Sequence, residues 1–161
     1  MKKSLFLLFI LSSTSSHADF GDSIAKAFFQ KKVEHVYEKA LQCDPLEKDP
    51  KSGMDAKDWI KIQPTLPGWQ MLAEIEKVAN EANSFARSKK TNDKIRHCLA
   101  GCYIAQKLDY QSAVLVGWYK ELQDASDCSK NTSFEKKDYE ATIFGARGAD
   151  SEKGCERFCK K

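Results

Sequence analysis

The sequence predicts an all-α fold: a single, disulfide-stapled helical domain of about five to six helices. Apolar residues recur every three to four positions along most of the chain, as on the buried face of a helix. No stretch of useful length alternates apolar and polar residues as a half-buried strand does. The chain also holds six cysteines, an even number that suits a small cross-linked domain.

The first half of the chain predicts two long helices joined by a loop. Residues 23–41 carry apolar side chains at helical spacing. Residues 44–68 contain all four prolines, which predicts a long loop with at most a short turn near 55–60. Residues 69–89 form the second helix. Its expected buried face is Leu72, Ile75, Val78, Ala79, Ala82, Phe85 and Ala86.

The second half predicts four shorter helices. Thr91 or Asn92 caps the third helix and Asp109 caps the fourth, because these side chains accept hydrogen bonds from the first N–H groups of a helix. A polar loop precedes the fifth helix, and Ser151 caps the sixth. These helices are expected to run to about 107, from 109 to about 125, from 135 to 144, and from 151 through the last two cysteines.

The N-terminus has the features of a secretory signal peptide. Two lysines precede a short apolar run, and Ser16 and Ala18 supply small residues before a cleavage site. The run is far shorter than the about 20 apolar residues that a membrane-spanning helix needs. We therefore expect residues 1–18 to be a leader and residues 19–161 to be one helical domain, secreted or periplasmic, with no transmembrane segment.

The charge balance excludes one class of partner. Without the two lysines of the leader, 24 basic residues face 23 acidic ones. A nucleic-acid-binding protein would carry a clustered basic surface, whereas the lysines here are spread along the chain beside acidic residues. We expect no nucleic-acid partner. An envelope polymer, a lipid or a protein remains open.

The spacing of the cysteines predicts how they pair. Two pairs are each separated by three residues, so each pair lies on one face of a helix, one turn apart. If these two helices pack antiparallel, the first cysteine of each pair lies beside the second cysteine of the other pair. The expected disulfides are Cys98–Cys159, Cys102–Cys155 and, with the remaining two, Cys43–Cys128. A zinc site of His97 and these thiols is the alternative, disfavoured because structural zinc prefers tighter spacings and reduced thiolates.

A candidate site lies on the hairpin formed by the third and fourth helices, around the stretch "IRHCLAGC". Counted from the turn, His97 lies about 11 residues before it and Glu121 about 12 after, so at about 1.5 Å per residue both stand at the same height. Asp124 follows one turn further on. A histidine and two carboxylates on a rigid scaffold suit general acid–base chemistry. The alternative is an ordinary surface group. The other mature histidine, His35, is expected to be a surface or packing residue.

Two glycines lie one turn inward from this pair, Gly101 and Gly117. A glycine inside a helix costs about 1 kcal/mol relative to alanine, so each needs a reason. Either the helix axes approach closely there, or a cleft opens beneath His97 and Glu121. The two tryptophans that flank the proline loop, Trp59 and Trp69, pose a similar choice between lining a groove and anchoring the loop to the core.

Four segments follow one another in the second half: "IRHCLAGCYIA", "GWYKELQD", "DYEATIFGARGA" and "CERFC". Their order resembles a small domain of bacterial secreted proteins and the C-terminal toxin modules of polymorphic (Rhs-type) toxins. The resemblance covers about residues 92–161 and brings no established reaction with it. The chain departs from the pattern at Thr142, where the pattern has asparagine. The residues that match it are Arg96, His97, Cys98, Cys102, Gly117, Lys120, Glu121, Asp124, Asp138, Gly145, Cys155 and Cys159.

These observations predict an exported, toxin-like hydrolase that acts at the cell envelope. His97 is the expected general base or acid, Glu121 and Asp124 its partner carboxylates, and Asp138 a supporting acid. Glycan, phospholipid and peptide bonds are all open as targets, and paired carboxylates would suit glycan cleavage. We expect no cofactor and no metal. The alternative is a non-catalytic binding or inhibitor module, in which the same residues would lie on a convex surface instead of in a pocket.

Overall fold

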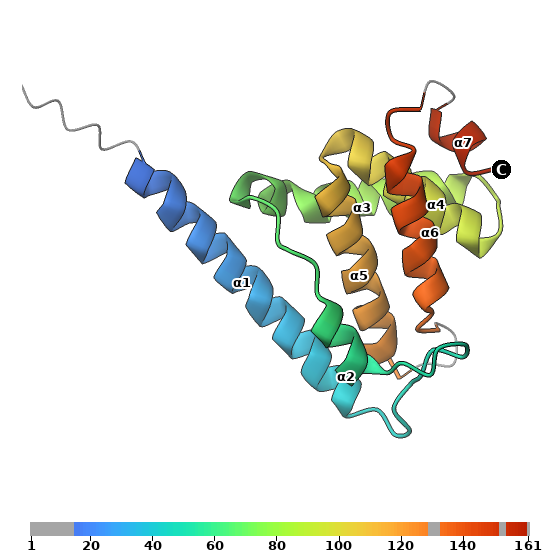
Figure 1. The fold of residues 1–161 in the computed structure, drawn as a ribbon, viewed down its shortest axis with the longest axis horizontal. Helices are drawn as coiled ribbons and strands as arrows, with labels where there is room; N and C mark the ends of the chain where they lie inside the picture. Colours follow the sequence, from blue (N-terminus) through green and yellow to red (C-terminus); the bar gives the residue numbers. More distant parts are fainter. Residues whose placement is uncertain (1–14, 129–132, 152–153, 161) are drawn as a thin grey trace, which may run out of the picture.

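The computed structural model describes residues 15–128, 133–151 and 154–160, and within these ranges the chain is all-α, as predicted (Figure 1). The side chains of residues 15–21, and most of the predicted leader, lie outside the described part. The helices are α1 (Ser15–Leu41), α2 (Ala56–Trp59), α3 (Trp69–Ser88), α4 (Asp93–Lys107), α5 (Tyr110–Ser126), α6 (Lys136–Arg147) and α7 (Gly154–Phe158), and a 3-10 turn, η1 (Ile60–Ile62), follows α2.

Three helices differ from their predicted bounds. α1 begins at Ser15 instead of residue 23, since no proline interrupts the earlier residues. α6 continues past the predicted end at residue 144 to Arg147, so Gly145 lies inside the helix. α7 ends at Phe158, so its second cysteine lies just beyond the helix. The turn predicted in the proline loop is a real but short helix, which Asp55 caps by accepting from two backbone N–H groups.

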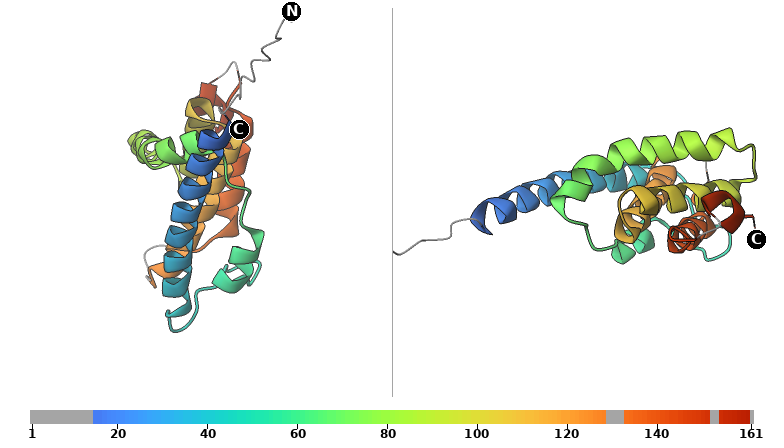
Figure 2. Two further views of the ribbon diagram at one scale, coloured as in Figure 1. Left: turned by 90° about the vertical axis from the view of Figure 1, so that its left-hand side faces the viewer. Right: turned by 90° about the horizontal axis from the view of Figure 1, so that it is seen from above.

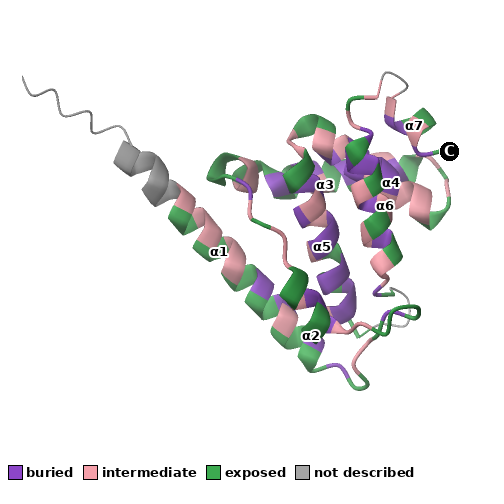
Figure 3. Ribbon diagram, viewed as in Figure 1, coloured by how far each residue is buried: buried purple, intermediate pink, exposed green. Residues whose placement is uncertain are grey.

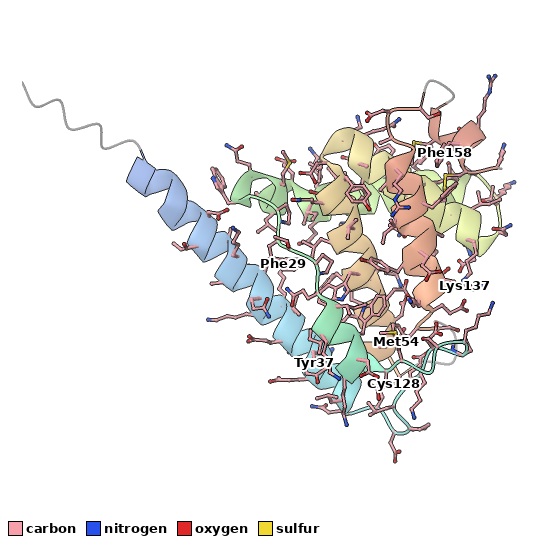
Figure 4. All side chains as sticks on the ribbon, viewed as in Figure 1. Phe29, Tyr37, Met54, Cys128, Lys137 and Phe158 are labelled. Carbon is pink, nitrogen blue, oxygen red and sulfur yellow. A yellow bond between two sulfur atoms is a disulfide. The ribbon has the colours of Figure 1, made fainter. Side chains whose placement is uncertain are left out.

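Helix α5 is the centre of the fold and contacts α1, α3, α4 and α6. Figure 3 shows buried residues along most of its length. On one side, Trp118 and Trp59 are fully buried and each donates its indole N–H to the other's backbone carbonyl oxygen, at 3.1 and 3.0 Å. Trp59 thus anchors the proline loop to the core. On another side, Phe29 points from α1 towards α5, where its ring centroid lies 5.6 Å from that of Tyr119 (Figure 4).

Helices α4 and α6 cross at very short range, and glycines allow it. A Cβ atom built on Gly101 would lie 2.0 Å from the carbonyl oxygen of Thr142, and one built on Gly145 would lie 1.9 Å from that of Cys98. A Cβ atom on Gly117 would lie 2.8 Å from the Thr142 side chain. The helical glycines are therefore explained by a close approach of helix axes, which α6 makes to α4 and to α5.

The three disulfides join the same cysteines that the spacing predicts. Cys98 pairs with Cys159 and Cys102 with Cys155, so α7 is fastened to α4. Cys43 pairs with Cys128, which lies just after α5 (Figure 4). Seen from above in Figure 2, α7 lies beside the end of the molecule opposite the start of α1. No helix of the described ranges is long and apolar enough to cross a membrane.

Candidate functional site

His97 lies in a broad cavity of about 1180 Å³ between α1, α3, α4, α5 and α6. Small-molecule sites commonly measure about 300–1,000 Å³, so the space is ample for a ligand. Asn92 starts α4 by accepting a hydrogen bond from the Ile95 N–H at 2.9 Å, which places His97 in the second turn of the helix. Asp124, Asp138 and Lys120 also line the cavity, and their charges act on His97.

The contact between His97 and Thr142 favours one tautomer of the histidine. The hydroxyl of Thr142 donates to the backbone carbonyl of Asp138 at 3.0 Å, so its oxygen is left to accept from another group. That oxygen lies 3.5 Å from Nδ1 of His97. We therefore assign the ring hydrogen of the neutral histidine to Nδ1, which leaves the lone pair on Nε2.

Nε2 faces two carboxylates. It lies 3.8 Å from an oxygen of Asp138 and 4.0 Å from an oxygen of Asp93. These distances are too long for direct hydrogen bonds, but a water molecule or a hydroxyl between the groups could bond to both. The side chain of His97 is 20% exposed and that of Asp138 only 7%, so the pair is reached from the cavity while most of it is shielded from solvent.

Burial shifts the pKa values of the whole cluster. It lowers the pKa of His97 below its ordinary value, with the charges of Asp138 and Asp93 acting in the opposite direction. It raises the pKa of Asp138 against the hydrogen bond from Lys94, and the pKa of Asp124 against its ion pair with Lys120. Several shifted groups in one concave place are typical of a functional site, although structural networks also produce them.

Glu121 does not reach His97 as the sequence suggested it would. Its side chain is fully buried, and one carboxyl oxygen accepts a hydrogen bond from the Glu135 backbone N–H at 3.0 Å. The other oxygen has no hydrogen-bond partner among the described residues. Burial raises the pKa of Glu121 to about 9, so the group is protonated at neutral pH. The structure brings Asp138 to His97, and Glu121 to the start of α6.

Three acidic side chains, two from the proline loop and one from α5, hold that start. The backbone N–H groups of residues 134–136 donate, in order, to Glu47, Glu121 and Asp49, at 2.8 to 3.0 Å. Lys136 is the first residue of α6 and its N–H lacks a partner within the helix, so these contacts to it and to the two residues before it fix where α6 starts. The sequence contained no signal for the two acids of the proline loop, because each lies 87 residues from the group it binds.

Lys94 is a second residue that the sequence did not single out. Its ammonium group lies 2.6 Å from oxygens of both Glu135 and Asp138, and it ties the start of α4 to α6. Asp124 pairs with Lys120 on its own helix, one turn away. His35 is exposed on α1, in keeping with a surface residue.

Three residues of the site could hold a metal ion. Asp93, His97 and Asp138 each offer one ligand atom, and these atoms lie within 4.8 Å of one another. Nitrogen and carboxylate ligands of this kind suit several divalent ions. In the structure, however, the two carboxylates also pair with Arg96 and Lys94, which compete with an ion for the same oxygens.

No protein-family model, no curated protein and no solved structure matches the chain.

Proposed function

We propose that the protein is an exported, toxin-like hydrolase of the cell envelope, with His97 as general base and Asp138 as its partner carboxylate. The observation that supports this most is His97 itself, whose Nε2 lies 3.8 Å from a carboxylate oxygen of Asp138 inside a large cavity. A base with a lowered pKa is unprotonated near neutral pH, the state that general-base catalysis needs. The carboxylate stabilises the imidazolium that forms when the base takes a proton.

The proposed step is attack by water on an acyl carbon. Nε2 of His97 removes one proton from the water as its oxygen bonds to the carbonyl carbon. The bond from that carbon to the leaving oxygen or nitrogen then breaks, and the imidazolium returns the proton to the leaving group. The products are a carboxylic acid and an alcohol or amine. Thr142 holds the ring through Nδ1, and Lys94 holds Asp138 in place.

Export rests on two features. Three disulfides with no free cysteine in the chain suit an oxidising compartment, since such bonds are rare in the cytosol. The leader-like N-terminus points to the same compartment. The segments that resemble toxin modules lie in the half of the chain that carries His97 and Asp138, which supports an effector role.

Hydrolysis assays on the purified chain test this proposal, with panels of acyl esters and peptides. We expect His97→Ala to lower the rate by roughly 10²–10⁴-fold, the usual contribution of a general base. Asp138→Asn should lower it less. Retained folding is checked by circular dichroism, and His35→Ala, which replaces an exposed histidine, is the matched control and should leave the rate unchanged.

The pH profile gives an independent readout. The rate should fall as the pH drops through the pKa of His97, which lies below 6.5, because the protonated ring cannot act as a base. Repeating the assays with a chelator and with added divalent ions distinguishes a metal-assisted reaction at Asp93, His97 and Asp138 from one in which His97 acts without a metal ion. A folded His97→Ala protein with full activity on every substrate that the wild type cleaves would exclude the catalytic role and favour a binding module.

A further inference from the structure

The cavity that holds His97 continues into an apolar groove between α1 and α3. Phe28 and Phe29 of α1 line it from one side, and Trp69 and Leu72 of α3 from the other. Two of these side chains remain largely open to solvent, Phe28 at 64% exposure and Trp69 at 42%. Large exposed aromatic side chains along a concave wall are typical of a surface that binds an apolar ligand.

The apolar part and the polar part of the cavity lie in series. On α3, the lining runs from Trp69 through Ala79 towards Ala86, and His97 of α4 follows at the far end. Seventeen residues of helix between Trp69 and Ala86 correspond to about 26 Å of groove at about 1.5 Å per residue. Such a length holds an extended hydrocarbon chain whose polar end would reach the candidate base.

The charges along the cavity suit a ligand without a large net charge. Basic and acidic side chains alternate on the lining and pair with one another, as Lys32 does with Glu76 at 3.1 Å and Arg96 with Asp93 at 2.7 Å. A polyanion such as a nucleic acid would need an unpaired basic surface. A zwitterionic head group needs no such unpaired basic surface.

From this arrangement we propose that the substrate is an acyl lipid, a zwitterionic glycerophospholipid that places one acyl chain between α1 and α3 and its ester at His97. This inference rests on the proposed hydrolase for the reaction but not for the binding. In the reaction, water adds its oxygen to the ester carbon, the bond from that carbon to the glycerol oxygen breaks, and His97 carries the proton from the water to that oxygen. A fatty acid and a lysolipid or glycerol derivative result.

Binding is tested first, with the full mature chain carrying His97→Ala so that no hydrolysis interferes. Monoacyl glycerophosphocholines of increasing chain length are titrated below their micelle concentrations and followed by calorimetry. Each added methylene should tighten binding by about threefold to fourfold until the groove is full, as burial of a CH₂ group predicts. Affinity that does not depend on chain length would overturn the proposal.

Two variants locate the chain in the groove. Phe28→Ser and Trp69→Ala should each weaken binding of the longer lipids by roughly tenfold, since part of an apolar contact is lost, and leave the shortest lipid unaffected. Leu41→Ser on the same helix as Phe28 and Tyr110→Ala are matched controls, because both residues are exposed apolar side chains outside the cavity. Equal losses in variants and controls would contradict the assignment. A dimer of the lipid-free protein that Phe28→Ser dissociates would instead assign the groove to a second copy.

Hydrolysis by the wild type separates the two proposals. Cleavage of diacyl phosphocholine vesicles and of monoacyl phosphocholines, lost in His97→Ala, would support both. Chain-length-dependent binding without cleavage of any ester would keep the lipid groove and remove the hydrolase. Cleavage of short esters alone, with no gain from longer chains and no effect of Phe28→Ser, would keep the hydrolase and remove the lipid groove.

Discussion

The titratable side chains of the site divide into two roles that burial keeps apart. His97 is neutral and faces the cavity, where its Nε2 is available to a ligand. Glu121 is closed off from solvent and holds the start of α6 through a backbone hydrogen bond. Both groups are in their uncharged form at neutral pH because burial disfavours the charged one. His97 is suited to chemistry, whereas Glu121 positions the helix that carries Asp138.

The role of Glu121 makes a prediction about stability and pH. Its pKa rises from an ordinary value of 4.5 in the unfolded chain to about 9 in the folded one, so the folded state binds the extra proton between these values. Its contribution to the free energy of unfolding is therefore full below pH 4.5 and declines as the pH rises to about 9. Glu121→Gln cannot ionise and should escape this decline.

Urea unfolding of the wild type and of Glu121→Gln at pH 4 and pH 8 measures the difference. We expect similar stabilities at the lower pH and a variant that is more stable by roughly 2 kcal/mol at the higher one, less than the full shift because a charged site relaxes. Glu140→Gln, an exposed acid on α6, is the control and should give the same small difference at both values. Parallel pH profiles for wild type and Glu121→Gln would show that Glu121 is not held protonated.

The sequence located the cluster but not the roles of its members. Helical spacing and the turn placed His97 and Glu121 at one height and Asp124 one turn further on, and the resemblance to toxin modules added Asp138. Which carboxylate meets His97 depends on where α6 starts, and that start depends on hydrogen bonds to acids of the proline loop. A loop without periodicity gives no indication of such long-range contacts, so the pairing could not be predicted.

At the scale of helices, most of the elements could be predicted because their caps and apolar faces are local features. Asn92 and Asp109 cap α4 and α5 as predicted, each through a side chain that accepts from a backbone N–H. The packing partner of α4 was less accessible to sequence. The hairpin of α4 with α5 is present, but the closest approach is made by α6, through Gly101 and Gly145.

Replacing either crossing glycine by alanine should be strongly destabilising. The added methyl group would lie about 2 Å from a backbone carbonyl oxygen of the opposite helix, at Thr142 for Gly101 and at Cys98 for Gly145. Backbone cannot move aside as a flexible side chain can, so the helices must separate. We expect a loss of about 3 kcal/mol in the free energy of unfolding, the upper part of the usual range for overpacking.

Thermal or chemical unfolding measures this loss, and a glycine in open space gives the control. A Cβ atom on Gly68 would meet no atom within 4 Å, and serine is a favoured residue at its position before α3. Gly68→Ser should therefore leave the stability within about 0.5 kcal/mol of the wild type. If Gly101→Ala were equally well tolerated, the two helices could not cross as closely as the structure has them.

At the scale of the whole molecule, the disulfides decide which parts can move relative to the site. The bonds from Cys98 and Cys102 reach α7, and Cys98 directly follows His97. The bond between Cys43 and Cys128 instead joins the end of α1 to the end of α5. The disulfide pairing could be predicted from the sequence because two pairs of cysteines, each one helical turn apart, can be joined in few ways. A bond within one turn of helix does not suit disulfide geometry.

The two bonds to α7 taken together, and the bond between Cys43 and Cys128, should contribute similarly to stability and differently to activity. They close loops with sequence separations of 53, 61 and 85 residues. The first two loops are nested, so either bond to α7 keeps that loop closed without the other. Loop closure depends on the logarithm of length, so removing both bonds to α7, or the single bond between Cys43 and Cys128, is expected to cost about 4 kcal/mol. Removing both bonds to α7, however, releases the backbone next to His97. The variant with alanine at Cys98, Cys102, Cys155 and Cys159 should lose hydrolysis at temperatures where it is still folded.

The variant Cys43→Ala with Cys128→Ala is the matched comparison, because it removes a bond of similar stabilising effect far along the chain from His97. It should melt at a similarly reduced temperature yet keep its rate below that temperature. Peptide mapping without reductant must first find Cys98 joined to Cys159 and no free thiol in the wild type, since a bond between Cys98 and Cys102 would contradict the fold itself. If both variants then lost activity only on unfolding, the bonds to α7 would stabilise the domain without positioning His97, and the rigidity of the site would have to come from the crossing of α4 and α6 alone.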